Sequence, residues 1–416
     1  MNKFKIKSLS LLIVVLTVFS VQPWLNVTVS TTSLSWILNF IIICITYSIK
    51  NNINTRNNTS YIKRGDSQII NIYLIWLLLS SIRGGFIADN YWEYKQLIKG
   101  FQSSILPLFV FIFSIPNITG FVLKTWLKYA LIIFIFLIPF LGKDGYHFYL
   151  GPIFIIGCFL PLLSQKWKII ITSLLILMLT ADLGARSQVI KSSIVLLIAL
   201  GIYLKRFIPI KLLKTIHWMC YIIPIILLFL GISGIFNIFK DLSSNKGKYI
   251  ETKVVDGQVV ESDLAADTRT FIYVEVIESA IKHNYVIWGR TPARGNDSAT
   301  FGAYNAEELK TGKYERHANE VCHPNIFTWL GLIGMSLYSL IYLRSSYLAV
   351  YKSNNDYVKY LGCFIAFRWA YGWIEDGNTF AILSISLWMI IAMGISIKFR
   401  YMNNREFETW IKKIFN

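Results

Sequence analysis

Charged residues are scarce in this chain, and their scarcity argues against a soluble fold. Only 15% of the 416 residues are Asp, Glu, Lys or Arg, well below the roughly 25% usual for soluble globular domains. Hydrophobic residues make up 55% of the chain, and the mean hydropathy is +0.51. The composition therefore indicates a protein that presents much of its surface to lipid.

Several motifs that carry chemistry in other proteins are also missing. The sequence has no Gly-rich phosphate loop, no repeat with a period of about 20–50 residues and no Cys/His group with metal-ligand spacing. Its His residues are scattered, at positions 147, 217, 283, 317 and 323. Cys322 alone lies near a polar segment, whereas Cys44, Cys158, Cys220 and Cys363 fall in apolar runs, so no disulfide framework is expected. We expect neither a metal nor another cofactor.

Long apolar runs are what the sequence has in quantity. A membrane-spanning helix needs about 20 mostly apolar residues, and a helix satisfies its own backbone hydrogen bonds in lipid. We therefore predict an all-α integral membrane protein. Its roughly twelve spans lie near residues 9–25, 34–49, 69–86, 101–116, 125–142, 147–164, 167–184, 187–204, 216–237, 323–343, 357–374 and 378–397.

These runs divide the chain into three parts. Residues 1–236 hold about nine spans, residues 237–322 form one large polar loop with short helices, and residues 323–416 hold about three spans and a tail. Lys3, Lys5 and Lys7 precede the first run, and no small-residue cleavage site follows it, so we expect an uncleaved first helix.

The net charge of +18 suggests nucleic acid at first, but the positions of the basic residues favour another explanation. Most Lys and Arg outside the large loop fall at the two ends of the chain and in every second short loop, for example Lys50 to Arg64 and Lys205 to Lys214. Positive residues favour the cytoplasmic side of a membrane. We therefore predict that both termini are cytoplasmic and that the slightly acidic loop 237–322 faces outward, and we expect no nucleic-acid partner.

Two polar segments on the expected outer face interrupt the apolar pattern among the N-terminal spans. Ser81–Lys95 carries Arg83 at the end of the third run, and its Tyr and Trp residues fit an interfacial aromatic belt equally well. The short turn 181–188 places Arg186 in the first turn of the next helix, where free backbone amides and a guanidinium together suit an anion. A simple ion pair with Asp182 is the alternative.

Two more such segments lie in or next to the large loop. Asp267 is a plausible helix N-cap, so Arg269 would stand in a first helical turn and repeat the arrangement at Arg186. Arg290 and Arg294 follow in a loop, where they fit substrate binding or simple solvation. His323 and Asn325 lead into the tenth run; a His can accept a proton near neutral pH, although a lone interfacial His is often incidental.

In order and spacing, these residues resemble the bacterial O-antigen ligase and O-antigen polymerase superfamily over roughly residues 68–345. Its members carry an Arg after a short outer turn, an Arg early in a large periplasmic loop, and a His-Asn segment before a Gly-Leu-Ile-Gly helix. Arg186, Arg269 and His323 with Asn325 match these features, ahead of Gly331–Gly334. Pro324 separates His323 from Asn325 here, which leaves His317 as a second candidate.

The resemblance implies a GT-C-like membrane glycosyltransferase of the bacterial inner membrane that needs no metal. Its donor would be an undecaprenyl-diphosphate-linked oligosaccharide, with Arg186 and Arg269 on the diphosphate, His323 as the base, and Arg83, Arg290, Arg294 and Asn325 as further substrate contacts. The acceptor would be a lipid-linked glycan for a polymerase, working with a chain-length regulator, or lipid A–core for a ligase. We favour the polymerase.

A flippase or secondary transporter is the alternative from another class. Arg368, inside the eleventh run, is the residue that best supports transport, because charge within the membrane often marks a substrate pathway. Glu375 and Asp376 follow it and are expected to neutralise it.

Overall fold

The protein is a helical bundle. The computed structural model describes residues 3–25, 32–56, 61–181, 186–233, 250–255, 258–263, 270–308 and 312–415. Helix accounts for 79% of the structure. Eight described segments are long and apolar enough to cross a membrane, namely Lys3–Trp24, Ser33–Asn52, Arg64–Ile87, Tyr91–Phe113, Pro116–Phe140, Arg186–Tyr203, Ile210–Gly231 and Cys322–Tyr351. The chain is therefore an all-α, multi-pass membrane protein.

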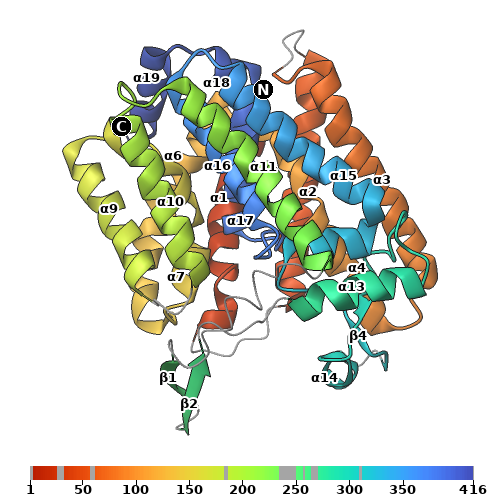
Figure 1. The fold of residues 1–416 in the computed structure, drawn as a ribbon. Helices are drawn as coiled ribbons and strands as arrows, with labels where there is room; N and C mark the ends of the chain where they lie inside the picture. The colour runs from red at the N-terminus through yellow and green to blue at the C-terminus, as the bar shows by residue number, and fades with distance from the viewer. Residues whose placement is uncertain are drawn as a thin grey trace.

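The helices before the large loop follow one another with short connections (Figure 1). They are α1 (Lys3–Phe19), α2 (Thr32–Arg56), α3 (Arg64–Ile87), α4 (Tyr91–Ser104), α5 (Val110–Phe113), α6 (Pro116–Leu137), α7 (Gly145–Tyr149), α8 (Gly151–Gly157), α9 (Gln165–Thr180), α10 (Arg186–Tyr203) and α11 (Ile210–Ile232). Short 3-10 turns extend several of them, namely η1 (Gln22–Trp24), η2 (Leu106–Phe109), η3 (Ile138–Phe140) and η4 (Leu160–Leu162).

The remaining elements belong to the large loop and the C-terminal helices. The loop contains β1 (Ile250–Val255), β2 (Gln258–Asp263), α13 (Thr270–Lys282), β3 (Asn296–Asp297), α14 (Gly302–Glu308) and β4 (Glu315–Arg316). The strands pair antiparallel as β1 with β2 and β3 with β4. After the loop come α15 (Cys322–Tyr351), α16 (Asp356–Tyr371), α17 (Ile382–Ile395), α18 (Ile397–Tyr401) and α19 (Asn404–Phe415).

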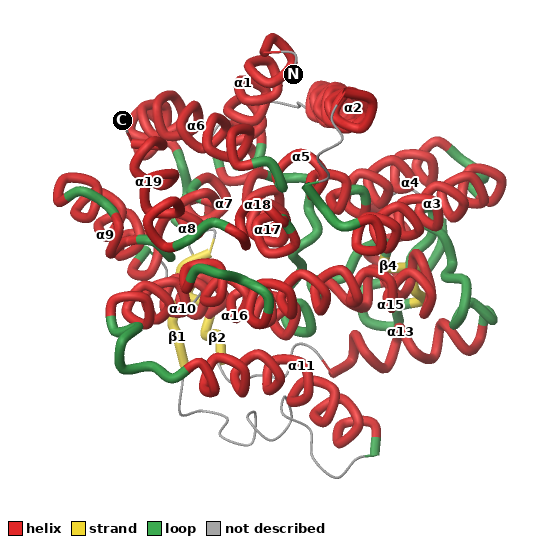
Figure 2. The backbone as a smooth tube through the Cα atoms, turned by 90° about the horizontal axis from the view of Figure 1, so that it is seen from above, coloured by secondary structure: helices red, strands yellow, loops and turns green. Residues whose placement is uncertain are grey.

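Every predicted apolar run overlaps helical residues, but four of the twelve fall short of a full span. Run 147–164 is split into α7, α8 and η4, and the helices of the seventh, eleventh and twelfth runs have 16, 16 and 14 residues. At Gly151, the first residue of α8, a Cβ would lie 2.7 Å from the Cα of Leu383 in α17. α8 therefore packs directly on α17, which is buried along almost its whole length and lies near the middle of the bundle (Figure 2).

Helix α15 is interrupted at Gly331, where φ is +67° and ψ is −169°. Loop residues fill the gap in its hydrogen bonding: Arg290 N donates to Thr328 O at 2.7 Å, and Leu332 N donates to Val286 O at 2.8 Å. The indole of Trp76 donates to Leu330 O at 2.9 Å. Non-helical backbone at membrane depth is tolerated where protein groups satisfy it, so part of the large loop is built into the bundle here.

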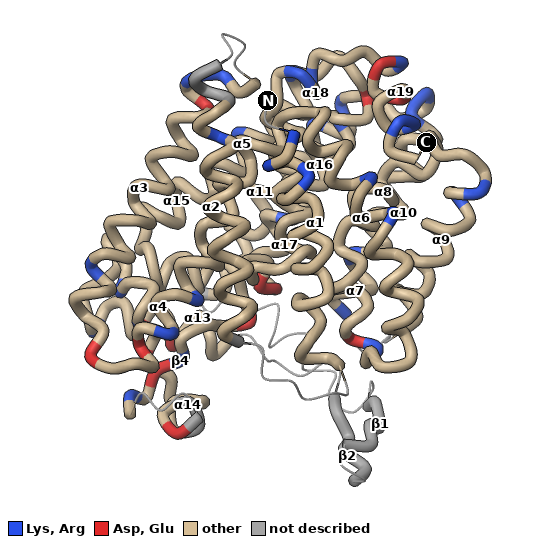
Figure 3. The backbone as a smooth tube through the Cα atoms, turned by 180° about the vertical axis from the view of Figure 1, so that it is seen from behind, with Lys and Arg blue, Asp and Glu red and all other residues tan. Residues whose placement is uncertain are grey.

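The two ends of the bundle differ in charge. Both termini lie at one end, and α13, α14 and the strands lie at the other (Figure 1). Many of the Lys and Arg residues gather at the end that holds the termini, around α18, α19 and the start of α9 (Figure 3). The large loop is thus on the face opposite the basic end.

Candidate functional site

The connection from α16 to α17 is the centre of the candidate site. We refer to its residues Gly372–Asn378 as the 372–378 turn. Gly372 N donates to Arg368 O at 3.1 Å as α16 ends. A Cβ on Gly372 would lie 2.9 Å from Nε2 of His323, so only glycine lets the imidazole approach this turn so closely.

Helix α10 is joined to the turn through Glu375. Lys191 Nζ lies 2.6 Å from Oε1 of Glu375, and Ser187 Oγ donates to the same oxygen at 2.5 Å. Arg368 lies 3.4 Å from the other carboxylate oxygen. The predicted neutralisation of Arg368 is thus confirmed for Glu375. Arg186 begins α10 and is exposed, one turn before Lys191; its predicted partner Asp182 lies outside the described residues.

Helix α15 begins against the same turn. Cys322 N donates to Glu375 O, and His323 N donates to Gly372 O, both at 3.2 Å. His323 Nε2 donates to the carbonyl of Trp369 at 2.9 Å, which fixes the proton of a neutral imidazole on Nε2. The ring is only 1% exposed and lies 4.5 Å, centroid to centroid, from Trp373.

Helix α13 reaches the turn as well. The hydroxyl of Tyr273, in its first turn, donates to Trp373 O, and the two rings stack with centroids 6.4 Å apart. Arg269 lies outside the described residues, directly before the first residue of α13. The helix predicted to begin near Arg269 is confirmed from Thr270 onward. The starts of α10, α13 and α15, from three distant parts of the sequence, thus all contact the 372–378 turn.

Asn325 holds the entry to α15 in place. Its Oδ1 accepts from Asn319 N at 2.6 Å, and its Nδ2 donates to Asn319 O at 2.8 Å. The Asn325 side chain also hydrogen-bonds to Asp376. It therefore connects the end of the large loop with the 372–378 turn.

The adjacent carboxyl groups of Glu375 and Asp376 differ in their environments. Burial raises the pKa of Glu375, but the charges of Lys191 and Arg368 outweigh it and lower the pKa to about 2. Burial also raises the pKa of Asp376, the charge of Glu375 adds to the rise, and the pKa reaches about 6. A pair of carboxyl groups whose pKa values are driven apart is typical of sites that handle protons.

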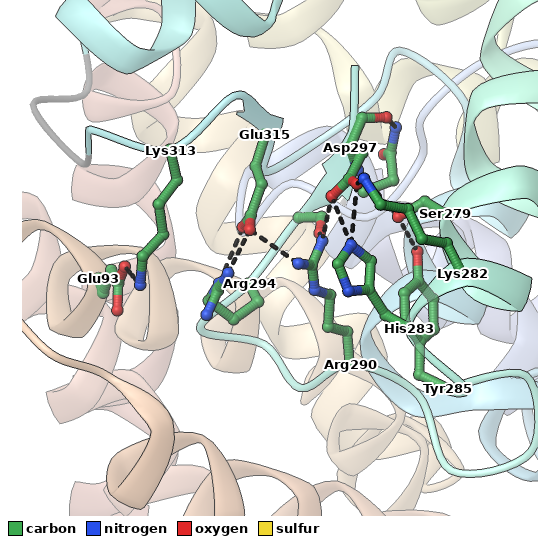
Figure 4. A network of polar contacts seen from close by, with 12 residues as sticks. Glu93, Ser279, Lys282, His283, Tyr285, Arg290, Arg294, Asp297, Lys313 and Glu315 are labelled. Atoms are coloured by element: carbon green, nitrogen blue, oxygen red, sulfur yellow. Dashed lines mark hydrogen bonds and ion pairs between the residues drawn. The ribbon is translucent and has the colours of Figure 1, made fainter. Parts of the chain in front are cut away.

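The side chains of Arg83, Arg290 and Arg294 are bound to other groups of the protein itself. The Arg83 guanidinium donates to the carbonyl oxygens of Trp288 and Gly289, next to the interruption of α15. Arg290 lies 2.9 Å from Glu315, and Arg294 Nε donates to the same carboxylate at 2.9 Å (Figure 4). These contacts hold the loop together, and whether the three also bind substrate stays a prediction.

Asp297 anchors the other side of this network (Figure 4). Its Oδ1 accepts from Arg290 at 3.0 Å, and Lys282 and His283 contact it from α13 and the turn that follows. Burial raises the pKa of Asp297, but these hydrogen bonds prevail and lower it to about 2. The carboxylate therefore stays charged at neutral pH, and it ties α13 to the segment 290–297.

His317, the second candidate histidine, lies inside the loop fold. Its Nε2 contacts Pro292 O at 2.8 Å, and its ring packs on Trp329 with centroids 5.4 Å apart. Burial lowers its pKa to about 4. His317 therefore supports the attachment of the loop to α15.

Sequence reasoning left Lys191, Glu375 and Asp376 out of the candidate site. Two signals point to them in retrospect: a lysine within an apolar run, and neighbouring acids between two apolar runs in a chain with few acids. In the described part of the chain, no three His, Cys, Asp or Glu side chains come close enough to hold a metal ion.

With this geometry in hand, comparisons with family models, curated proteins and solved structures find no match to the chain. Fold and site together define a multi-pass α-helical membrane protein with a buried charged cluster at the end of the bundle that holds the large loop.

Proposed function

We propose that this protein is a membrane glycosyltransferase that polymerises undecaprenyl-diphosphate-linked oligosaccharide repeats at the periplasmic face. The observation that carries the proposal is the meeting of α10, α13 and α15 at the 372–378 turn. Arg186 begins the first of these helices, Arg269 directly precedes the second, and His323 stands at the start of the third.

Diphosphate binding follows from the chemistry of two helix starts. The first amides of a helix have no partner within it, and the helix dipole favours an anion there. The exposed guanidinium of Arg186 adds bidentate donors at the start of α10. With Arg269 before α13, two cations and two sets of amides would hold the donor diphosphate and stabilise it as the leaving group.

The buried ion pair supports this reading by fixing the geometry. Lys191 and Glu375 tie α10 to the 372–378 turn, and the turn also holds the start of α15. An acceptor hydroxyl must line up opposite the diphosphate within about 3–3.5 Å of the anomeric carbon. A rigid connection between α10, which would bind the donor, and the 372–378 turn, which would face the acceptor, would keep the hydroxyl and the anomeric carbon aligned.

In this proposal the protein has a GT-C-like fold and lies in the inner membrane. It crosses the membrane twelve times, and both of its termini are in the cytoplasm. The four runs with short or broken helices would cross as α7–α8, α9, α16 and α17. The concentration of Lys and Arg at the end of the bundle that holds the termini supports this orientation (Figure 3).

Transport is the second candidate, and two observations favour it. α15 is interrupted at Gly331, and Lys191 and Arg368 bring charge into the bundle. Interrupted helices and intramembrane charge are features of secondary transporters. The charges here, however, pair with Glu375 close to the loop end of the bundle, which suits a site at one membrane face.

Deletion of the gene separates the candidates by the glycan that accumulates. Single repeats on the lipid carrier, exposed to the periplasm, mean a polymerase, whereas full-length polymer on the carrier means an O-antigen ligase. Single repeats confined to the cytoplasmic leaflet mean a flippase. Purified protein that lengthens the extracted lipid-linked repeat would establish the polymerase directly.

A further inference from the structure

The proton acceptor of the proposed reaction must be reachable by a sugar hydroxyl. His323 is poorly placed for this role, because its Nε2 already donates to Trp369 O and its ring is 1% exposed. The ring lies between Trp369, Trp373 and Tyr338, with centroids 5.3, 4.5 and 6.3 Å away. The imidazole therefore holds the end of α16 against α15.

Asp376 lies in the same turn and is partly exposed. Its Oδ1 accepts from Asn378 N at 3.0 Å, and the amide of Asn325 hydrogen-bonds to it from α15. Backbone and side chain thus orient one carboxyl group at the point where α15 and the 372–378 turn meet.

The groups that act electrostatically on Asp376 come from three elements. Glu375 precedes it in the turn, Lys99 belongs to α4, and Cys322 and Tyr342 belong to α15. Glu375 is held as a carboxylate by Lys191. A fixed negative charge beside Asp376 makes its carboxylate a better proton acceptor, whereas the positive charge of Lys99 lowers the pKa of Asp376.

We propose that Asp376 accepts the proton of the acceptor hydroxyl, and that His323 is a positioning residue. This inference rests on the proposed function. The hydroxyl oxygen forms a bond to the anomeric carbon of the donor, and its proton passes to the Asp376 carboxylate. The bond from that carbon to the diphosphate oxygen breaks, and its electron pair leaves with the diphosphate.

The pKa of Asp376 suits a general base. A general base works best when its pKa lies near the operating pH. With the pKa of Asp376 raised to about 6 by burial, the group is ionised at pH 7 yet more basic than an ordinary carboxylate. Glu375, with a pKa of about 2, stays ionised near neutral pH and is too weak a base to accept the proton.

The test compares Asp376→Asn and Asp376→Glu with the wild-type protein in proteoliposomes. The substrate is the lipid-linked repeat extracted from cells lacking the gene, and kcat is measured from pH 5 to 9. Wild-type kcat should rise with pH through about 6, as the carboxylate forms. Asp376→Asn should lower kcat by about 10²–10⁴-fold and abolish this rise. Asp376→Glu should restore part of the rate and the rise.

Asp89→Asn is the matched control, because Asp89 is an exposed acid between α3 and α4 whose carboxylate pairs with Lys313. It should keep both the rate and the pH profile. If Asp376→Asn retains the wild-type rate and pH dependence, Asp376 is not the acceptor, although the glycosyltransferase stands. If the wild-type protein itself never lengthens the repeat, the proposed function fails and this inference with it.

Discussion

Lys191 Nζ and Glu375 Oε1 lie 2.6 Å apart although the two residues are 184 positions apart in the sequence. The Lys191 side chain is 2% exposed and that of Glu375 is 19% exposed. The pair joins α10 to the 372–378 turn, and Arg368 shares its carboxylate. Removal of one member of a buried ion pair leaves the other charge uncompensated, which is more costly than removal of both.

The first prediction concerns this pair. Lys191→Met or Glu375→Gln alone should lower the free energy of unfolding by about 3–5 kcal/mol. The double variant should lose less than the sum of the two, because it leaves neither charge behind. Thermal unfolding in detergent would measure the coupling, and strictly additive losses would show that the two side chains do not interact.

The second prediction concerns the interruption of α15. A Cβ on Gly331 would lie 2.2 Å from Ile287 O, and φ is +67°. Gly331→Ala should therefore destabilise the protein by at least about 2 kcal/mol, from backbone strain and overpacking. Thermal unfolding of the purified variant would measure the loss.

Gly85→Ala is the matched control for Gly331→Ala. Gly85 lies within α3, and its added Cβ would have no atom within 4 Å. Alanine there should leave stability unchanged or raise it by up to about 1 kcal/mol, because alanine is the better helix former. Equal thermal stability of the two variants would mean that the backbone at Gly331 is an ordinary helix.

The third prediction is the topology, which rests on the basic residues at one end of the bundle. Reporter fusions after residues 60 and 210 should be cytoplasmic, and a fusion after residue 255 should be periplasmic. Alkaline phosphatase and green fluorescent protein report the two sides. A cytoplasmic signal at residue 255 would put the 372–378 turn on the wrong side for the proposed donor.

Apolar runs were sufficient to predict the bundle, because each span must satisfy its backbone within itself and so leaves a local signal. Breaks in these runs left weaker signals. The sequence shows a glycine at position 331, but the interruption of α15 depends on carbonyl and amide groups from residues 286–290. The close packing of Gly151 on Leu383 likewise joins residues that are far apart in the sequence.

Prediction of the candidate site was partial for the same reason. Arg186 and His323 could be selected because helix starts and polar residues are visible locally. The role of Glu375 could not be predicted, because its partners Lys191 and Ser187 come from a helix that is distant in the sequence. The burial of His323 beneath Trp373 also follows from long-range packing that no local pattern records.

The fourth prediction tests the diphosphate clamp. Arg186→Lys and Arg269→Lys each keep the positive charge but lose the bidentate fork of the guanidinium. Elongation of the lipid-linked repeat should fall sharply while the amount of protein in the membrane is unchanged. Arg405→Lys, on an exposed position of α19, is the control and should be neutral. Wild-type polymer from both clamp variants would exclude diphosphate binding by these residues.

The fifth prediction separates positioning from proton transfer at His323. In His323→Ala the hydrogen bond to Trp369 O is lost, so the turn should shift and kcat should fall by about 10²-fold. His323→Gln provides an amide that can donate to the same carbonyl, and it should recover most of the rate. Both variants should keep the rise of kcat near pH 6, because Asp376 still titrates.

The competing hypothesis makes opposite predictions for the same proteins. If His323 is the base, Gln cannot replace it, because an amide does not accept a proton near neutral pH. His323→Gln would then be as inactive as His323→Ala, and both would lose the pH dependence. His317→Ala provides the structural comparison: it removes the contact with Pro292 O, so it should lower thermal stability yet keep the pH profile. A histidine variant that abolishes the rise near pH 6, in protein that unfolds at the wild-type temperature, would transfer the proton-accepting role from Asp376 to that histidine.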